Sequence, residues 1–249
     1  MAVSTEAKKI IKAATRSLGF DVITWKPQSS SDAALARMLA HHEIDVVLDV
    51  GANEGQYARY LRGIGFRGRI VSFEPCSATH ERLRISASRD AMWTAAPRAA
   101  LGNREGQIRL NVASNGGASS SVLPILEEHR NAAPWVDYVR SEMVSITRLD
   151  RAAAELLSKE HRIFLKVDVQ GYELEVLEGA PELLPRILGV QLELSLVSLY
   201  EGQALFPVLM DFMQQRGFQI WGIMPGLMSN STGRLLQTDV IFFRDHRFC

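Results

Sequence analysis

An apolar stretch that contains a carboxylate runs directly into two glycines. Val46 to Val50 form this stretch, with Asp49 near its end, and Gly51 and Gly55 follow. The pattern predicts a buried parallel strand, a tight turn and the first turn of a helix, where free N–H groups bind polar ligands. The spacing differs from the Gly-x-Gly-x-x-Gly of dinucleotide binders, and Asp49 would repel a pyrophosphate. We therefore predict a site for a ligand that carries positive charge.

A second apolar stretch ends in another acid. Residues 70–73 precede Glu74, and in a doubly wound sheet this strand lies beside the first. An acid at its tip accepts hydrogen bonds from ribose hydroxyls. The spacing of Asp49 and Glu74 is what a strand, helix and strand unit requires. The alternative is that Asp49 caps a helix and Glu74 is a solvated strand end.

Two further acids belong to the same predicted edge of the sheet. Asp168 ends the apolar strand 162–168, and the fourth strand of such a fold neighbours the first, so Asp168 should lie beside Asp49. Glu193 stands close to the end of the next strand. Asp168 and Glu193 are candidates for a general base, a contact with a ligand amine or ligands of Mg²⁺, because carboxylate oxygens suit all three roles. The sequence leaves these alternatives open.

Alternating strands and helices position these acids. The seventh strand should run antiparallel to the sixth, because the link 224–238 has no room for a crossover helix. The fold class predicted is α/β, a Rossmann-like doubly wound sheet of seven strands with the last strand antiparallel. The expected helices span 54–63, 78–88, 172–177 and 206–216, and the expected later strands span 69–74, 93–101, 107–112, 189–194, 218–223 and 239–243.

The N-terminal segment and one insertion lie outside this pattern. Residues 1–43 are expected to form accessory helices, and 44–249 one domain. The first helix is amphipathic and would pack on the domain or act at a membrane surface or in targeting. Ser31 or Asp32 would cap the second. The irregular segment 114–142 predicts a lid over a substrate, with a solvated linker as the alternative, and its His129 is a further candidate base.

The amino-acid composition limits the kinds of binding partner and the cellular location that we expect. Lysine plus arginine equal aspartate plus glutamate at 28 each, so nucleic acid and anionic membranes are disfavoured. The two cysteines, Cys76 and Cys249, cannot build a disulfide framework, and no apolar run has the length of a membrane span. We expect a cytoplasmic protein without a transmembrane segment. The N-terminal helix or the last hairpin could form a homodimer.

These segments together resemble the FkbM family of S-adenosylmethionine-dependent methyltransferases. The resemblance covers about residues 44 to 245 and is most like the actinobacterial sugar O-methyltransferases. It implies the class I methyltransferase fold, S-adenosylmethionine as cofactor and a hydroxyl group as acceptor. The segments that carry it are Leu48–Tyr57, Phe73–Pro75, Ala100–Gly102, Ser119–Ser120, Leu149–Asp150 and, most specifically, Leu165–Ala180.

The resemblance also implies roles for individual residues. The cofactor would contact Asp49, Gly51, Asn53, Gly55, Tyr57, Glu74, Pro75, Ala100 and Asp168. The acceptor would contact Ser119, Ser120, Gln170, Tyr200 and Glu201, the last two from a loop similar to that of sugar-modifying members. The segment 121–138 departs from any family pattern.

The functional hypothesis is transfer of a methyl group to a hydroxyl of a saccharide, such as a glycolipid or polysaccharide precursor. An alcohol is a poor nucleophile until its proton is removed, which calls for a base or a metal. A polyketide or other small hydroxylated molecule is the alternative acceptor. A nicotinamide-dependent oxidoreductase and a catalytically silent binding module are the other classes considered.

Overall fold

The computed structural model describes residues 5–17, 19 and 30–244, so Cys249 and parts of the predicted accessory segment lie outside it. Within these residues, seven strands form one sheet in the order β3-β2-β1-β7-β8-β10-β9. Only β10 runs antiparallel to its neighbours there, which confirms the predicted fold class. The strands are β1 (Val46–Val50), β2 (Arg69–Phe73), β3 (Trp93–Ala95), β7 (Ile163–Val167), β8 (Ile187–Ser195), β9 (Phe218–Pro225) and β10 (Gln237–Arg244).

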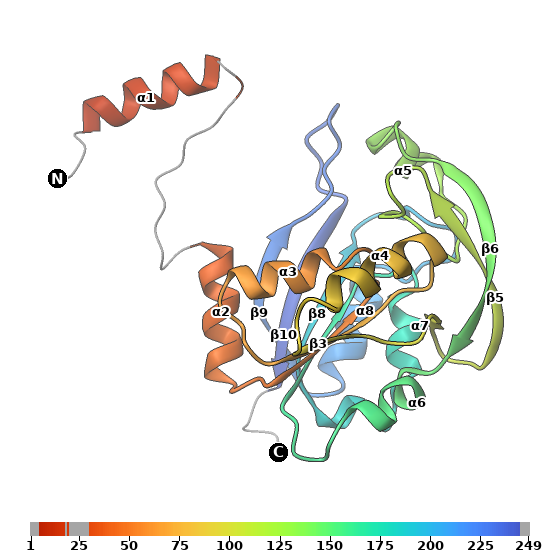
Figure 1. The fold of residues 1–249 in the computed structure, drawn as a ribbon. Helices are drawn as coiled ribbons and strands as arrows, with labels where there is room; N and C mark the ends of the chain where they lie inside the picture. The colour runs from red at the N-terminus through yellow and green to blue at the C-terminus, as the bar shows by residue number, and fades with distance from the viewer. Residues whose placement is uncertain (1–4, 18, 20–29, 245–249) are drawn as a thin grey trace.

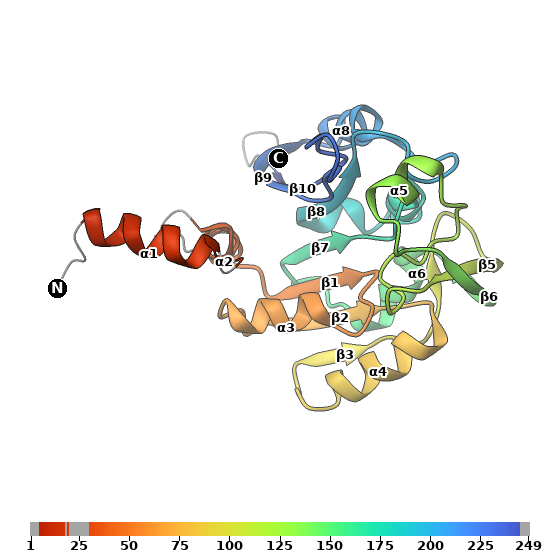
Figure 2. The same ribbon diagram turned by 90° about the horizontal axis from the view of Figure 1, so that it is seen from above.

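Helices cover both faces of this sheet (Figures 1 and 2). Successive residues of a strand point to opposite faces, and β1 is buried along its whole length. Val46 and Leu48 pack in one core cluster, whereas Val47 packs in another. The first cluster includes α6 (Leu149–Ala153), α7 (Glu173–Glu178) and α8 (Phe206–Gln214), and the second includes α2 (Ser31–His41), α3 (Gln56–Gly63) and α4 (Ser77–Ala87). Short 3₁₀ turns are η1 (Ala154–Leu156) and η2 (Leu184–Arg186).

The single strand expected over residues 93–101 is wrong, because this stretch forms two strands in different sheets. Pro97 follows β3, and proline has no N–H to donate to a neighbouring strand. After it, β4 (Ala100–Leu101) joins β6 (Tyr138–Thr147) and β5 (Gly106–Ala113) in a second sheet of order β4-β6-β5. The expected strand 107–112 is therefore one arm of an antiparallel pair outside the main sheet.

The insertion between β5 and β6 has a small core of its own. It contains α5 (Glu127–Ala132) and lies beside the loop that follows β8 (Figure 1). Its apolar residues are buried together with Leu199, Tyr200 and Leu236. The segment is therefore packed, unlike the solvated linker that was the alternative.

The two N-terminal helices differ in how they relate to the sheet. In α2, Leu35 and Leu39 pack into the core, and the N-cap is Ser30, whose Oγ accepts a hydrogen bond from the backbone N–H of Ala33 at 3.1 Å. The predicted caps, one or two residues later, are already inside the helix. By contrast, α1 (Thr5–Ser17) stands apart in both views, and its Ile10 and Ile11 are exposed. No helix of the described residues is long and apolar enough to span a membrane.

Candidate active site

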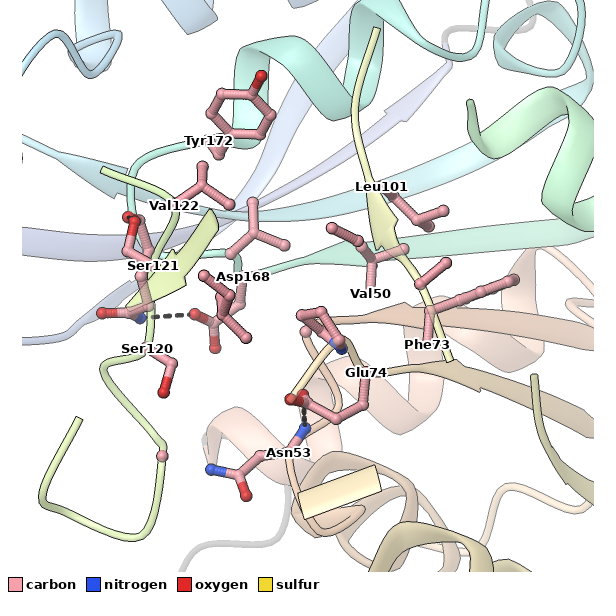
Figure 3. A pocket seen from close by; sticks show the side chains of 18 of the residues that line it. Val50, Asn53, Phe73, Glu74, Leu101, Ser120, Ser121, Val122, Asp168 and Tyr172 are labelled. Atoms are coloured by element: carbon pink, nitrogen blue, oxygen red, sulfur yellow. Dashed lines mark hydrogen bonds between the residues drawn. The ribbon is translucent and has the colours of Figure 1, made fainter. Parts of the chain in front are cut away.

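A pocket with an empty volume of about 570 Å³ opens at the carboxyl ends of β1, β2 and β7. Figure 3 shows Glu74 beside Asn53 at one end of this pocket and Tyr172 at the other. The insertion contributes part of its wall through residues 117, 118 and 120–122. Eight of the predicted site residues line it, namely Gly51, Asn53, Glu74, Pro75, Ala100, Asp168, Ser120 and Gln170.

Glu74 is held in place by three donors from the protein. One carboxylate oxygen accepts from the backbone N–H of Asn53 at 2.8 Å, and the other accepts from the backbone N–H of Cys76 at 2.9 Å and the hydroxyl of Thr79 at 2.8 Å. Burial raises the pKa of Glu74, and these hydrogen bonds oppose that shift. A carboxylate accepts about four hydrogen bonds, so one position remains for a ligand hydroxyl in the pocket.

Asn53 supplies a polar atom that the protein leaves unused. Its backbone takes a φ of 48°, and its Oδ1 is buried without a partner among the described residues. A buried acceptor of this kind is costly unless a ligand or water donates to it. Together with the acceptor position on Glu74, it fits a ligand that carries hydroxyl or amino groups, as S-adenosylmethionine does.

The two glycines of the turn are required by contacts within the protein. Gly51 and Gly55 have φ values of 77° and 87°. A Cβ on Gly51 would lie 1.8 Å from the backbone oxygen of Asp168, and one on Gly55 would lie 2.3 Å from the ring of Trp93. Gly51 lines the pocket, whereas Gly55 is the N-cap of α3 and lies outside the lining. Contacts within the protein and the positive φ values, rather than the close approach of a ligand, therefore require glycine at both positions.

Strand register places a row of polar side chains beneath the turn. Asp49 is opposite Ser72 on one side and Lys166 on the other, and Lys166 is opposite Gln191. Ser72 donates to Asp49 Oδ2 at 3.1 Å. Burial raises the pKa of Asp49, and the neighbouring Lys166 opposes the shift. Asp49 is fully buried and lies outside the pocket lining, so this row is a charged layer below the site.

Lys166 is the positive charge that Asp49 faces. Its Nζ lies 3.5 Å from Asp49 Oδ1, 3.3 Å from Asp168 Oδ2 and 3.3 Å from the backbone oxygen of Gly51. Two of these three neighbours are carboxylates, so the protein itself neutralises the ammonium. Burial acts to lower the pKa of Lys166, but the carboxylates of Asp168 and Asp49 raise it overall. The positive charge predicted opposite Asp49 is thus supplied by the protein itself, at a residue that the sequence analysis did not single out.

The side chain of Gln170 joins the two candidate catalytic acids. Its Nε2 donates to Asp168 Oδ1 and Glu193 Oε2, both at 2.7 Å, and its Oε1 accepts from the hydroxyl of Tyr200 at 2.7 Å. Glu193 also accepts from Gln237 Nε2 at 2.9 Å, and burial raises its pKa well above the ordinary value. Gln170 therefore supports the acids and also lines the pocket, and the contact with the acceptor that the resemblance implied for it stays a prediction.

A Mg²⁺ ion between Asp168 and Glu193 does not fit this arrangement. The ion needs several oxygen ligands around it. The space between the two carboxylates holds the Nε2 donor of Gln170, and the ammonium of Lys166 lies against Asp168. The described residues include no group of three or more acidic, histidine or cysteine side chains suited to a metal.

Several other predicted residues lie away from the pocket lining. The insertion buries His129 against the ring of Tyr200, with ring centroids 5.2 Å apart, and burial lowers the pKa of His129. Tyr200 is itself fully buried. Glu201 is exposed, and the Oγ of Ser119 accepts from the side chain of Asn115 at 2.9 Å. The resemblance implied the roles of Ser119, Tyr200 and Glu201, and the chemistry of imidazole suggested that of His129, but neither kind of signal shows which way a loop packs.

A second hollow adjoins the pocket on the side of α3. Its empty volume is about 880 Å³, and it shares Gly51, Asn53, Ala118 and Asp168 with the pocket. Its other lining residues are Ala52, Gln56, Tyr57, Tyr60, Lys166, Gln191 and Asp239. Of these, only Tyr57 was expected from the sequence to contact a ligand. We call this space the tyrosine hollow.

Glu173, which was not among the residues expected from the sequence to have a role, stabilises the loop after β7. Its carboxylate accepts from the backbone N–H groups of Val169 at 3.0 Å and Gly171 at 3.1 Å. Burial raises its pKa from 4.5 to about 7, and the backbone hydrogen bonds only partly oppose the shift. Folded protein therefore holds a proton on Glu173 between about pH 4.5 and 7 that the unfolded chain has released.

This shift predicts a loss of stability as the pH rises. The favourable contribution of Glu173 is complete below pH 4.5 and disappears above about pH 7. Between pH 5 and 8, wild type should lose about 2–3 kcal/mol more unfolding free energy than Glu173→Gln, which cannot ionise. Urea unfolding of both proteins at several pH values measures the difference. Parallel pH profiles for the two proteins would contradict the assignment.

The fold and the pocket together define a class of protein. The strand order with antiparallel β10, the glycine turn after β1 and the acid at the tip of β2 are those of class I S-adenosylmethionine-dependent methyltransferases. A family model described as the methyltransferase FkbM domain matches residues 49–220. The match spans more than half of the chain, which therefore belongs to the FkbM methyltransferase family. S-adenosylmethionine is accordingly its cofactor.

The individual relatives share less than 30% sequence identity with this chain. The chain is 27% identical over 174 residues to the 2-O-methyltransferase NoeI of Sinorhizobium fredii, across 68% of this chain and 70% of the relative. It is similar to the crystal structure of an FkbM methyltransferase from Methylobacillus flagellatus, with a TM-score of 0.49, 15% identity and coverage of 81% of this chain and 44% of that one. Fibrillarin from Aeropyrum pernix, solved with S-adenosyl-L-methionine, gives a TM-score of 0.45 with 13% identity and coverage of 80% and 66%.

Proposed function

We propose that this protein is an O-methyltransferase that transfers a methyl group from S-adenosylmethionine to a hydroxyl of a saccharide. The observation that carries the proposal is the position of Asp168, the carboxylate that the pocket and the tyrosine hollow share among the described residues. The relative NoeI is named as a 2-O-methyltransferase, which supports oxygen as the methyl acceptor.

The residues at one end of the pocket are proposed to bind the cofactor. Glu74 would bind the ribose through its remaining acceptor position, and Asn53 would accept a hydrogen bond at the same end of the pocket. The apolar side chains of Val50, Phe73 and Leu101 lie near that end and suit the flat adenine ring (Figure 3). When bound, S-adenosylmethionine supplies a methyl group on a sulfonium, which an oxygen can attack in line.

Asp168 is the proposed general base. Its side chain is 32% exposed, and Lys166 and Gln170 hold one oxygen each at 3.3 and 2.7 Å. In the reaction, Asp168 would take the proton of the acceptor hydroxyl, whose oxygen would bond to the methyl carbon as the carbon–sulfur bond breaks. The products are a methyl ether and S-adenosylhomocysteine, and the proton then passes to solvent. The segment 117–122 of the insertion would exclude water from this step.

Glu74→Gln tests the cofactor site. The amide keeps the size of the side chain but loses the charge, and a hydrogen bond to a charged group contributes about 1.5–3 kcal/mol. The dissociation constant for S-adenosylhomocysteine should rise by about tenfold to a hundredfold in isothermal titration calorimetry. The exposed Glu201→Gln is the matched control and should bind as wild type does. Equal affinity in both variants would remove Glu74 from the cofactor site.

The function itself is tested with wild-type protein. Calorimetry with S-adenosylhomocysteine comes first, followed by methyl transfer to methyl glycosides of hexoses and 6-deoxyhexoses, with Mg²⁺ and with EDTA. Binding, and turnover of a glycoside that EDTA leaves unchanged, would support the proposal and the absence of a metal step. Binding without turnover of any glycoside would favour the alternative acceptor, a polyketide or other small hydroxylated molecule.

Binding of NADH in place of S-adenosylhomocysteine would revive the oxidoreductase hypothesis. A silent binding module would bind the cofactor product and methylate no acceptor. The cytoplasmic location, the homodimer and the domain boundaries stay predictions, which cell fractionation, a sizing column and limited proteolysis would test.

A further inference from the structure

The tyrosine hollow has a lining whose chemistry differs from that of the pocket. Tyr57 and Tyr60 stand three residues apart on one face of α3, with ring centroids 5.9 Å apart. The hydroxyl of Tyr57 donates to Gln191 at 2.8 Å, and that of Tyr60 donates to Asp32 at 3.0 Å. Both rings are therefore fixed by hydrogen bonds at their tips. Fixed rings offer a ligand apolar contact at little cost in side-chain entropy.

The hollow also presents an acid with spare hydrogen-bonding capacity. Asp239, on β10, accepts at Oδ1 from Gln191 Nε2 at 3.3 Å, and no described residue donates to its Oδ2. The buried cation of the lining, Lys166, lies 3.5 Å from Asp49 Oδ1 and 3.3 Å from Asp168 Oδ2, so two carboxylates of the protein already neutralise its charge. A ligand in the hollow therefore meets acceptors and aromatic rings, which suits hydroxyl groups and opposes a carboxylate or phosphate.

The geometry of methyl transfer points to the same place. The attacking oxygen, the methyl carbon and the sulfur must lie in line. With its ribose at Glu74, a bound cofactor that extends to Asp168 would carry its methyl group to the boundary with the tyrosine hollow. An oxygen that attacks from the far side of the methyl group then comes from the tyrosine hollow.

We propose that the tyrosine hollow is the acceptor site and binds a pyranose ring, with Tyr60 against the ring and Asp239 accepting hydrogen bonds from a pair of adjacent hydroxyls. The C–H groups of a pyranose are weakly positive and are attracted to the negative face of an aromatic ring. A carboxylate accepts from two neighbouring hydroxyls without strain. This inference rests on the proposed function and names residues for the acceptor that differ from Ser119, Ser120, Tyr200 and Glu201.

Two variants test the site. Tyr60→Ala removes the ring, and Asp239→Asn removes a charge without changing size. In both, KM for the methyl glycoside that wild type methylates best should rise by about tenfold or more, while the dissociation constant for S-adenosylhomocysteine stays within about twofold of wild type. Asp211→Asn, an exposed aspartate on α8, is the matched control and should change neither quantity.

The competing occupant is the amino-acid end of the cofactor. 5′-Methylthioadenosine lacks that end, so its affinity provides a comparison. Weaker binding of S-adenosylhomocysteine in Tyr60→Ala and Asp239→Asn, with unchanged binding of 5′-methylthioadenosine, would overturn the inference and leave the proposed function in place. An unchanged KM in Asp239→Asn, which alters no volume and should fold, would overturn it as well. By contrast, a wild-type protein that methylates no saccharide contradicts the proposed function itself.

Discussion

Replacing Asp168 with asparagine is expected to lower kcat by about a hundredfold to ten-thousandfold, the range that general bases contribute. The amide has almost the shape of the carboxylate but cannot take up the proton of the acceptor hydroxyl. It also places an N–H₂ group against either Lys166 or Gln170, both of which donate to Asp168 in the folded protein. Single-turnover assays with saturating cofactor measure the chemical step directly.

Cofactor affinity distinguishes the two roles that the sequence left open for Asp168. If Asp168 is the base, S-adenosylhomocysteine should bind Asp168→Asn within about threefold of wild type. If instead it holds the amino group of the cofactor, the dissociation constant should rise by about tenfold or more, because a charged hydrogen bond is lost. The exposed Asp211→Asn again serves as the control. A kcat close to that of wild type would exclude Asp168 as the base.

Gly51→Ala is expected to cost about 4 kcal/mol or more of unfolding free energy, enough to leave little folded protein. The new Cβ would lie 1.8 Å from the backbone oxygen of Asp168, at a φ of 77° that alanine rarely adopts. Neither strand can move easily, since β1 and β7 are paired along their length in the middle of the sheet. Urea unfolding followed by circular dichroism measures the loss.

Gly65→Ala distinguishes the two causes of the expected loss at Gly51, which are the contact of the new Cβ with Asp168 and the unfavourable backbone φ. Gly65 has a φ of 97°, but a Cβ there would meet no atom within 4 Å. Its substitution should cost only the conformational term, about 1–2 kcal/mol. Equal losses in the two variants would show that the contact with Asp168 relaxes and that backbone conformation alone demands glycine at position 51.

The sequence determined the architecture because local patterns carry that information. Buried strands such as Val46–Val50 read as continuous apolar runs, and the short link before β10 excludes a crossover, so strand direction followed. Asp168 and Glu74 were also found from sequence, since the chemistry at strand ends is tied to the sheet topology. The prediction of a single strand over residues 93–101 was wrong because a proline interrupts an otherwise apolar stretch. The apolar pattern alone did not show that the chain passes from one sheet to another there.

The tertiary structure decided which side chains face the ligand. Strand register places Lys166 opposite Asp49. The negative charge of Asp49, which was expected to face a cationic cofactor, is therefore paired with a lysine of the protein. Packing of the insertion buried His129 against Tyr200 and brought residues 117, 118 and 120–122 to the pocket wall. Asp239 reaches the tyrosine hollow only because β10 inserts between β8 and β9. Such contacts join residues far apart in sequence, and no local pattern encodes them.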